Sequence, residues 1–122
     1  MPADTPRCFA LLPCAGSGAR AGGVVPKQYQ PVAGQPMVLH TLAAFAGVAR
    51  LRGTLVAVAS GDHFLQAYAS PSFFTVDCGG PTRADTVLGG LGALLERGAQ
   101  ANDWVLVHDA ARCLVTSARL MV

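Results

Sequence analysis

The chain has 122 residues, enough for one domain or for part of one. Its 9 Lys and Arg against 7 Asp and Glu leave a net charge of +2, which gives no electrostatic reason to expect a nucleic acid or an acidic membrane as partner. Hydrophobic residues make up 52% and charged residues 13%, so composition excludes a disordered chain. No stretch approaches the ~20 apolar residues that a membrane-spanning helix needs.

The four cysteines are expected to be free thiols. They are Cys8, Cys14, Cys78 and Cys113, and no pair forms a C-x-x-C motif of the kind found in metal and redox sites. The residues before Cys8 also lack the net positive charge of a signal peptide. We therefore expect a reducing compartment, and the cytoplasm is the default location.

The first half of the chain predicts strand, loop, helix and strand in that order. Residues 8–13 are a continuous apolar run, typical of a strand buried on both faces, and a glycine-rich loop follows over 14–23. Three prolines exclude a long helix from 26–36. Apolar residues at helical spacing predict a helix over 37–48, and residues 53–60 predict a second buried strand.

The second half continues the alternation. Residues 62–69 predict a short helix with Asp62 at its N-cap, and residues 73–76 predict a third strand. A tight glycine turn follows at 78–81, then a helix over 82–97, then a fourth strand over 103–107. A further helix is expected to begin at 116–121.

The predicted helix over 82–97 has clear local signals. Thr82 is followed three residues later by Asp85, which resembles a capping box. Five residues are expected to form its apolar stripe: Val87, Leu88, Leu91, Leu94 and Leu95.

Alternating strands and helices imply an α/β fold with a parallel sheet and right-handed crossovers. Ligands of such sheets bind beyond the carboxyl ends of the strands. Three loops are expected at those ends, at residues 14–27, 78–83 and 108–112. Because a new element begins where the chain stops, the sheet is expected to be incomplete.

The first loop has the residues that a polyphosphate site needs. Gly16 and Gly18 allow backbone N–H groups to form a nest for anionic oxygens, and Arg20 and Lys27 add two cations. A structural glycine turn with solvated basic residues is the alternative. The spacing also matches G-x-G-x-x-A, but the prolines and glycines prevent the required helix, and no acidic residue lies between Thr5 and Gly61 to bind a ribose.

A carboxylate at the end of the fourth strand is a candidate magnesium ligand. Mg²⁺ in proteins takes one or two carboxylates together with phosphate oxygens and water, and Asp109 stands at this position. A helix N-cap or an ion pair with Arg112 is the alternative. His108 is interpreted as a structural neighbour rather than a ligand, and Tyr29 and Trp104 as packing residues.

Taken together, the loops resemble one family. The segments 13–20 (PCAGSGAR), 26–29 (PKQY) and 36–41 (PMVLHT) are similar to the N-terminal signature of the 2-C-methyl-D-erythritol 4-phosphate cytidylyltransferases. The segments 79–87 (GGPTRADTV) and 105–112 (VLVHDAAR) resemble two further motifs of that family. The similarity runs in order from about Cys8 to Arg112.

The resemblance implies a Rossmann-like nucleotidyltransferase fold, a three-layer α/β/α arrangement with a mostly parallel sheet and its C-terminal part missing. Residues 1–122 would be the N-terminal, CTP-binding portion of a single domain. The implied reaction transfers CMP from CTP to 2-C-methyl-D-erythritol 4-phosphate, with release of pyrophosphate, in non-mevalonate isoprenoid precursor biosynthesis. The implied partners are CTP and a sugar-alcohol phosphate, the implied cofactor is Mg²⁺ or another divalent cation, and full-length members are homodimers.

The resemblance also assigns roles to residues. Arg20 and Lys27 would stabilise the charge of the transition state, and Asp109 would bind the metal. Ten residues would contact the nucleotide: Cys14, Ala15, Gly16, Ser17, Gly18, Gly79, Gly80, Arg83, Thr86 and Ala110.

Some features depart from the family. Cys14 stands where Ala is usual, and Pro81 replaces an acidic or polar residue beside the base pocket. The second half of the family's domain, which positions the acceptor and forms the dimer, has no counterpart here. Ribitol 5-phosphate cytidylyltransferases share these motifs and are one alternative, and an inactive nucleotide-binding fragment is another. A sugar-1-phosphate nucleotidyltransferase and a dinucleotide-dependent oxidoreductase fit the first loop less well.

Overall fold

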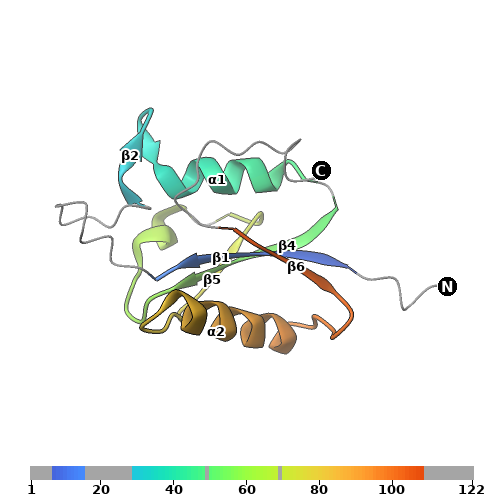
Figure 1. Ribbon diagram of the computed structural model, residues 1–122. Coiled ribbons are helices and arrows are strands. Elements are labelled where there is room, and N and C mark those ends of the chain that lie inside the picture. Colours follow the sequence, from blue (N-terminus) through green and yellow to red (C-terminus); the bar gives the residue numbers. More distant parts are fainter. Residues whose placement is uncertain (1–6, 16–28, 49, 69, 109–122) are drawn as a thin grey trace.

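A computed structural model describes residues 7–15, 29–48, 50–68 and 70–108. These residues form a four-stranded parallel sheet with one helix on each face (Figure 1). The predicted three-layer α/β architecture is confirmed for this part of the chain. The assignment of residues 1–122 to a single domain stays a prediction.

The central strand of the sheet is β1 (Cys8–Cys14). It pairs with β4 (Leu51–Val58) on one side and with β6 (Trp104–Val107) on the other, and β5 (Phe74–Val76) pairs with β4 at the edge. All these pairs are parallel, so the strands end at the same side of the molecule.

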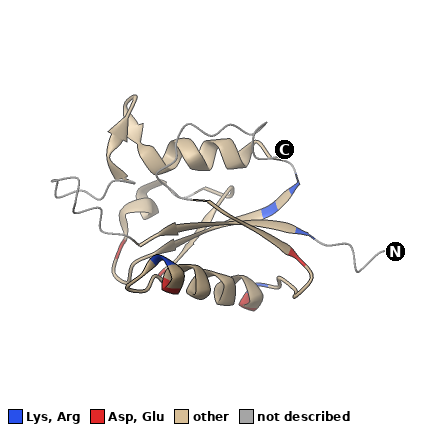
Figure 2. Cartoon of the chain, in the orientation of Figure 1, with Lys and Arg blue, Asp and Glu red and all other residues tan. Residues whose placement is uncertain are grey.

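The central strand is buried on both faces, as its continuous apolar run predicts. Leu11 belongs to one hydrophobic cluster and Leu12 to the other, on the opposite face of the sheet. No Lys, Arg, Asp or Glu occurs in β1, β5 or β6, and the coloured residues of Figure 2 lie mostly on α2 and around the strand ends. These three strands therefore supply no charged side chain to a functional site.

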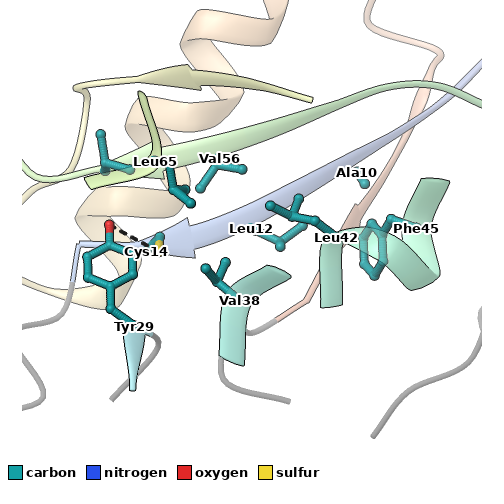
Figure 3. Packing of buried hydrophobic residues seen from close by; sticks show 10 residues of the cluster. Ala10, Leu12, Cys14, Tyr29, Val38, Leu42, Phe45, Val56 and Leu65 are labelled. Atoms are coloured by element: carbon teal, nitrogen blue, oxygen red, sulfur yellow. Dashed lines mark hydrogen bonds between the residues drawn. The ribbon is translucent and has the colours of Figure 1, made fainter. Parts of the chain in front are cut away.

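One face of the sheet is covered by α1 (Met37–Ala46), which buries Val38, Leu42 and Phe45. The helix ends at Ala46, two residues before the predicted end. Its last turn is closed by the Gly47 N–H, which donates to the Ala44 carbonyl at 3.2 Å, and by the Val48 N–H, which donates to the Phe45 carbonyl at 3.0 Å. Figure 3 shows these side chains packed against residues of β1.

A short hairpin before α1 was not predicted. Its strands are β2 (Pro31–Val32) and β3 (Gln35–Pro36), joined by Ala33 at φ 52° and Gly34 at φ 88°. Two successive positive φ values are typical of a type I′ hairpin turn, which usually carries Asn-Gly or Asp-Gly. Because Ala33 occupies the first turn position, the sequence lacks the Asn-Gly or Asp-Gly pair that would have predicted the turn. The absence of a long helix from the described residues 29–36 agrees with the prolines there.

The other face is covered by α2 (Arg83–Glu96). The capping box is confirmed: the Asp85 N–H donates to Thr82 Oγ1 at 3.1 Å, and that hydroxyl donates to the Asp85 carboxylate at 2.8 Å. The first bond satisfies one of the backbone donors that a helix start leaves free, and the second holds the two side chains together.

The predicted apolar stripe of α2 is partly wrong. Leu94 is buried and Val87 and Leu91 pack on the core, but Leu88 and Leu95 are 67% and 57% exposed. The buried face runs through Thr86, Gly90 and Leu94, at intervals of four residues. Gly90 sits at its centre because a side chain there would meet Leu11 (2.4 Å to Cδ1). Leu88 and Leu95 lie away from this line.

Two further expectations change in detail. The predicted short helix is a 3-10 helix, η3 (Phe64–Tyr68), with Asp62 Oδ1 accepting from the Phe64 N–H at 3.0 Å. Trp104 was expected to pack but is 70% exposed, because it occupies the first position of a strand at the edge of the described sheet.

Candidate functional site

Two of the three predicted loops meet at the carboxyl ends of β1 and β4. Cys14 and Val58 are register partners at these ends. The Gly79 N–H donates to the Val58 carbonyl at 2.9 Å, which places the glycine turn next to β4. A Cβ on Gly79 would lie 2.3 Å from the Cβ of Ala15, the residue after β1. The start of the predicted triphosphate loop therefore touches the predicted base-binding turn.

Both glycines of this turn are required by close packing. Gly79 leaves no room for a side chain between Ala15 and the Val58 carbonyl, and a Cβ on Gly80 would lie 2.5 Å from Asp85 Cβ. Without side chains, the backbone amides of the turn can approach a ligand closely. This is what a site that reads a base through backbone groups needs.

Thr86 fixes the conformation of the turn. Its side chain is 2% exposed, and its hydroxyl accepts from the Gly80 N–H at 3.1 Å. The same hydroxyl donates to the Thr82 carbonyl at 3.1 Å or to the Gly80 carbonyl at 3.4 Å. The sequence assigns Thr86 to nucleotide binding, which stays a prediction. The structure gives it a second role, in holding the turn.

Arg83 brings positive charge to this edge. It is the first residue of α2, its side chain is exposed, and the turn lies immediately before it. The start of a helix carries a partial positive charge, so the guanidinium and the helix dipole favour an anion in the same region. The predicted association of Arg83 with the turn at 78–81 is thus supported by its place in the fold.

Tyr29 lies beside the end of β1 and has two polar contacts. Its hydroxyl donates to Asp62 Oδ2 at 2.5 Å and accepts from the Cys14 thiol at 3.7 Å (Figure 3). Its ring stacks on Phe64, with centroids 4.0 Å apart. Burial, reinforced by Cys14 and Asp62, raises the pKa of Tyr29 well above its ordinary value, so the hydroxyl stays protonated. The packing interpretation is right for the ring but misses the hydroxyl.

His108 continues the sheet at the end of β6. Its N–H donates to the Leu11 carbonyl at 3.1 Å, and its ring lies against Phe45, with centroids 5.5 Å apart. Its Nε2 atom is buried and has no hydrogen-bond partner among the described residues. Contact with the core agrees with its interpretation as a structural neighbour.

The remaining assignments lie outside the described residues. They are Gly16, Ser17, Gly18, Arg20, Lys27, Asp109 and Ala110, together with Cys113 and the helix expected at 116–121. Six predicted site residues are described, namely Cys14, Ala15, Gly79, Gly80, Arg83 and Thr86, and all lie at this edge. Cys14 is buried, so any contact with a nucleotide would be through its backbone.

Three observations concern other kinds of site in the described part of the chain. It contains no group of three His, Cys, Asp or Glu side chains placed to hold a metal ion. Burial raises the pKa of the Cys78 thiol, which disfavours the thiolate that a nucleophile needs. No helix among the described residues is long and apolar enough to cross a bilayer.

Comparison with known proteins identifies a family. The family model described as IspD, 2-C-methyl-D-erythritol 4-phosphate cytidylyltransferase, matches residues 8–121. A relative from Albidiferax ferrireducens, named bifunctional enzyme IspD/IspF, is 61% identical over 113 residues, which are 91% of this chain and 27% of that protein. A 2-C-methyl-D-erythritol 4-phosphate cytidylyltransferase from Cupriavidus pinatubonensis is 49% identical over 120 residues, 93% of this chain and 48% of that protein.

Solved structures agree with this result. A 4-diphosphocytidyl-2C-methyl-D-erythritol synthase superposes with a TM-score of 0.79 at 34% identity, over 96% of this chain and 52% of that one. The bifunctional IspDF of Campylobacter jejuni superposes with a TM-score of 0.71 at 21% identity, which is a likeness of fold. The chain spans about half the length of the single-function proteins that it matches.

Proposed function

Since this chain belongs to the 2-C-methyl-D-erythritol 4-phosphate cytidylyltransferase family, we propose that it forms the CTP-binding portion of such an enzyme. The enzyme would transfer CMP from CTP to 2-C-methyl-D-erythritol 4-phosphate and release pyrophosphate, a step of non-mevalonate isoprenoid precursor biosynthesis. The observation that carries the proposal is the contact between Ala15 and the Gly79–Gly80 turn at the carboxyl ends of the parallel strands.

The reaction makes and breaks one kind of bond. A phosphate oxygen of the acceptor attacks the α-phosphorus of CTP in line, a new P–O bond forms, and the bond to pyrophosphate breaks. No covalent enzyme intermediate is needed, so the protein must position the reactants and neutralise negative charge. Arg20 and Lys27 are the cations proposed for this role, because both remain charged at neutral pH in ordinary surroundings.

The glycine turn is proposed to select the base. Backbone carbonyls at residues 79–80 can accept a hydrogen bond from the 4-amino group of cytosine. Uracil has an oxygen at that position, so two acceptors would face each other, and such a mismatch discriminates strongly. The Thr86 hydroxyl supports this role because it holds the Gly80 amide in place before any ligand arrives.

A divalent cation is proposed at Asp109. The backbone bond from His108 to Leu11 extends β6 to the carboxyl edge of the sheet, and Asp109 is the next residue. A single carboxylate suits Mg²⁺ that takes its other ligands from phosphate oxygens and water. When bound there, Mg²⁺ would neutralise charge on the phosphates of CTP.

Three further proposals follow from the family. The acceptor is a sugar-alcohol phosphate, the complete enzyme is a homodimer, and its location is the cytoplasm.

Calorimetric titration of the purified chain with CTP and magnesium tests the proposed site, with UTP and ATP as competitors of matched charge. Binding is measured rather than turnover because turnover also needs an acceptor site, and the chain spans only about half the length of these relatives. Saturable binding that prefers CTP is the expected result. A chain that circular dichroism shows to be folded and that binds none of the three nucleotides would contradict the proposal.

A further inference from the structure

Cys14 and Tyr29 are the two ends of one functional segment. Cys14 ends β1 and Tyr29 follows 15 positions later, yet the thiol and the hydroxyl meet at 3.7 Å. The residues between them include Arg20 and Lys27, the proposed catalytic cations. The contact therefore brings together the two described residues that flank this segment.

Asp62 joins the pair from a third position in the sequence. Its Oδ2 atom accepts from the Tyr29 hydroxyl at 2.5 Å, and its Oδ1 atom accepts from the Phe64 N–H at 3.0 Å. The Asp62 N–H in turn donates to the Ala59 carbonyl at 3.0 Å, just after β4. The carboxylate is thus held by its own backbone and aimed at the tyrosine.

The ring of Tyr29 is fixed as firmly as its hydroxyl. It stacks on Phe64 with an interplanar angle of 13°, and the side chain is buried. One residue later, the Gln30 carbonyl accepts from the Met37 N–H at 2.8 Å, which ties the chain to the start of α1. Packing alone would require only a phenyl ring here, so the hydroxyl and its two partners call for another explanation.

We propose that Tyr29 is a positioning residue, whose hydroxyl, held between Cys14 and Asp62, joins the two ends of the segment that carries Arg20 and Lys27. These three residues are called the Tyr29 cluster below. The proposal rests on the proposed function, because the effect on a ligand is that of the cations on the phosphates of CTP.

Chain geometry connects the cluster to the chemistry. Lys27 precedes Tyr29 by only two residues in the sequence. Anchoring both ends of a segment reduces the number of conformations it can adopt, and therefore the entropy that binding must remove. The raised pKa of Tyr29 keeps its proton on the hydroxyl, so the bond to Asp62 persists through neutral pH.

The first test compares two tyrosine variants. Tyr29→Phe keeps the stacked ring and removes only the hydroxyl. Tyr68→Phe is the matched control, because Tyr68 is 41% exposed and also contacts Phe64 but lies outside the cluster. In calorimetry with magnesium, Tyr29→Phe is expected to weaken CTP binding about tenfold, equivalent to about 1.4 kcal/mol, and Tyr68→Phe to leave it unchanged. The titrations use a temperature at which circular dichroism shows each variant to be folded.

A double-mutant cycle separates positioning from general stability. Asp62→Ala removes the same hydrogen bond from the other side, so it should weaken CTP binding as Tyr29→Phe does. The double variant should then lose little more than either single variant, because both remove one interaction. Asp62→Asn keeps an oxygen that accepts from the Phe64 N–H, and its amide nitrogen can donate to the Tyr29 hydroxyl, which reverses the bond but keeps the link. This variant is therefore expected to retain most of the affinity.

A second measurement needs no nucleotide. Trypsin can cleave after Lys27, and cleavage after Arg97, at the other end of the molecule near α2, serves as the internal reference. Loss of the cluster should speed cleavage after Lys27 relative to Arg97 in Tyr29→Phe and Asp62→Ala, but not in Tyr68→Phe.

The outcomes distinguish the two proposals. If the wild-type chain binds no CTP, the proposed function fails, and the trypsin ratio alone decides whether the cluster holds the segment. If the wild-type chain binds CTP and Tyr29→Phe and Asp62→Ala bind it equally well, the positioning role is wrong. An unchanged trypsin ratio in both variants also overturns it. Fully additive losses in the double variant would show that the two residues act separately, against the proposal.

Discussion

Gly90 provides a direct test of how α2 is seated on the sheet. In Gly90→Ala the new Cβ would lie 2.4 Å from Leu11 Cδ1 and 2.9 Å from Cδ2. Leu11 is fully buried in the central strand, so its side chain has little room to yield. We expect the substitution to force α2 and β1 apart or to push Leu11 out of its preferred rotamer.

The magnitude follows from two opposing effects. Overpacking of a tight core costs about 1–3 kcal/mol, whereas replacing Gly by Ala inside a helix gains about 1 kcal/mol. Gly92 is on the same helix, and a Cβ added there would have nothing within 4 Å, so Gly92→Ala should show the gain alone. The difference between the two variants therefore isolates the packing cost, and Gly90→Ala should be less stable than Gly92→Ala by about 1–3 kcal/mol.

Urea unfolding followed by circular dichroism measures this difference. With a dependence on urea of about 1–2 kcal/mol per M, the midpoints of the two variants should differ by about 0.5–3 M. Equal midpoints for Gly90→Ala and Gly92→Ala would refute the claim that close contact with Leu11 determines the residue at position 90. Gly92→Ala should itself be at least as stable as the unchanged chain.

The remaining predictions concern catalysis, pH and the turn. In an active enzyme containing this chain, Arg20→Ala and Lys27→Ala should each lower turnover by roughly 10²–10³, and near-normal turnover would remove that residue from the mechanism. Hydrogen bonds from the backbone N–H groups of Arg7 and Gln100, together with the Arg7 guanidinium, lower the pKa of Asp103 to about 2 from 3.8. The ionised Asp103 carboxylate should thus contribute its full stability above about pH 4, and this stability should be lost as the pH falls through 2. The urea midpoint of Asp103→Asn should lack this dependence on pH. Thr86→Val should cost about 1–3 kcal/mol in urea unfolding because it leaves the Gly80 N–H without its acceptor, whereas Thr86→Ser should retain the bond.

Local signals predicted the elements of the fold well. The signal for β1 is an uninterrupted apolar run, and the signal for the start of α2 is the Thr82–Asp85 capping box. Each depends only on residues close together in the sequence. The hairpin before α1 was missed because its turn lacks such a local signal. Ala33 has a positive φ there, and alanine in a sequence does not indicate that conformation.

Contacts between distant segments could not be predicted in this way. Periodicity placed Leu88 and Leu95 in the apolar stripe of α2, but the helix turns Gly90 toward the sheet because Leu11 fills the space above it. The same limit applies to the site. The motifs predicted which loops would bind a nucleotide, and that stays a prediction. The contact of Ala15 with Gly79 and the bond of Tyr29 to Asp62 depend on the tertiary packing, which no motif shows.

Four glycines link this packing to the candidate site, because each allows a close approach that a side chain would prevent. Gly90 lets α2 approach β1, and Gly89 lies so close to the Cys78 carbonyl that a Cβ would be 2.3 Å from the oxygen. Cys78 immediately precedes Gly79 and Gly80, whose own lack of side chains allows the turn to meet Ala15 and Asp85. The position of α2 on the sheet and the position of the turn proposed to bind the base are therefore set by one continuous set of contacts. A change that lifts the helix from the sheet would also move the backbone groups proposed to bind cytosine, so we expect substitutions at these four positions to change stability and nucleotide preference together.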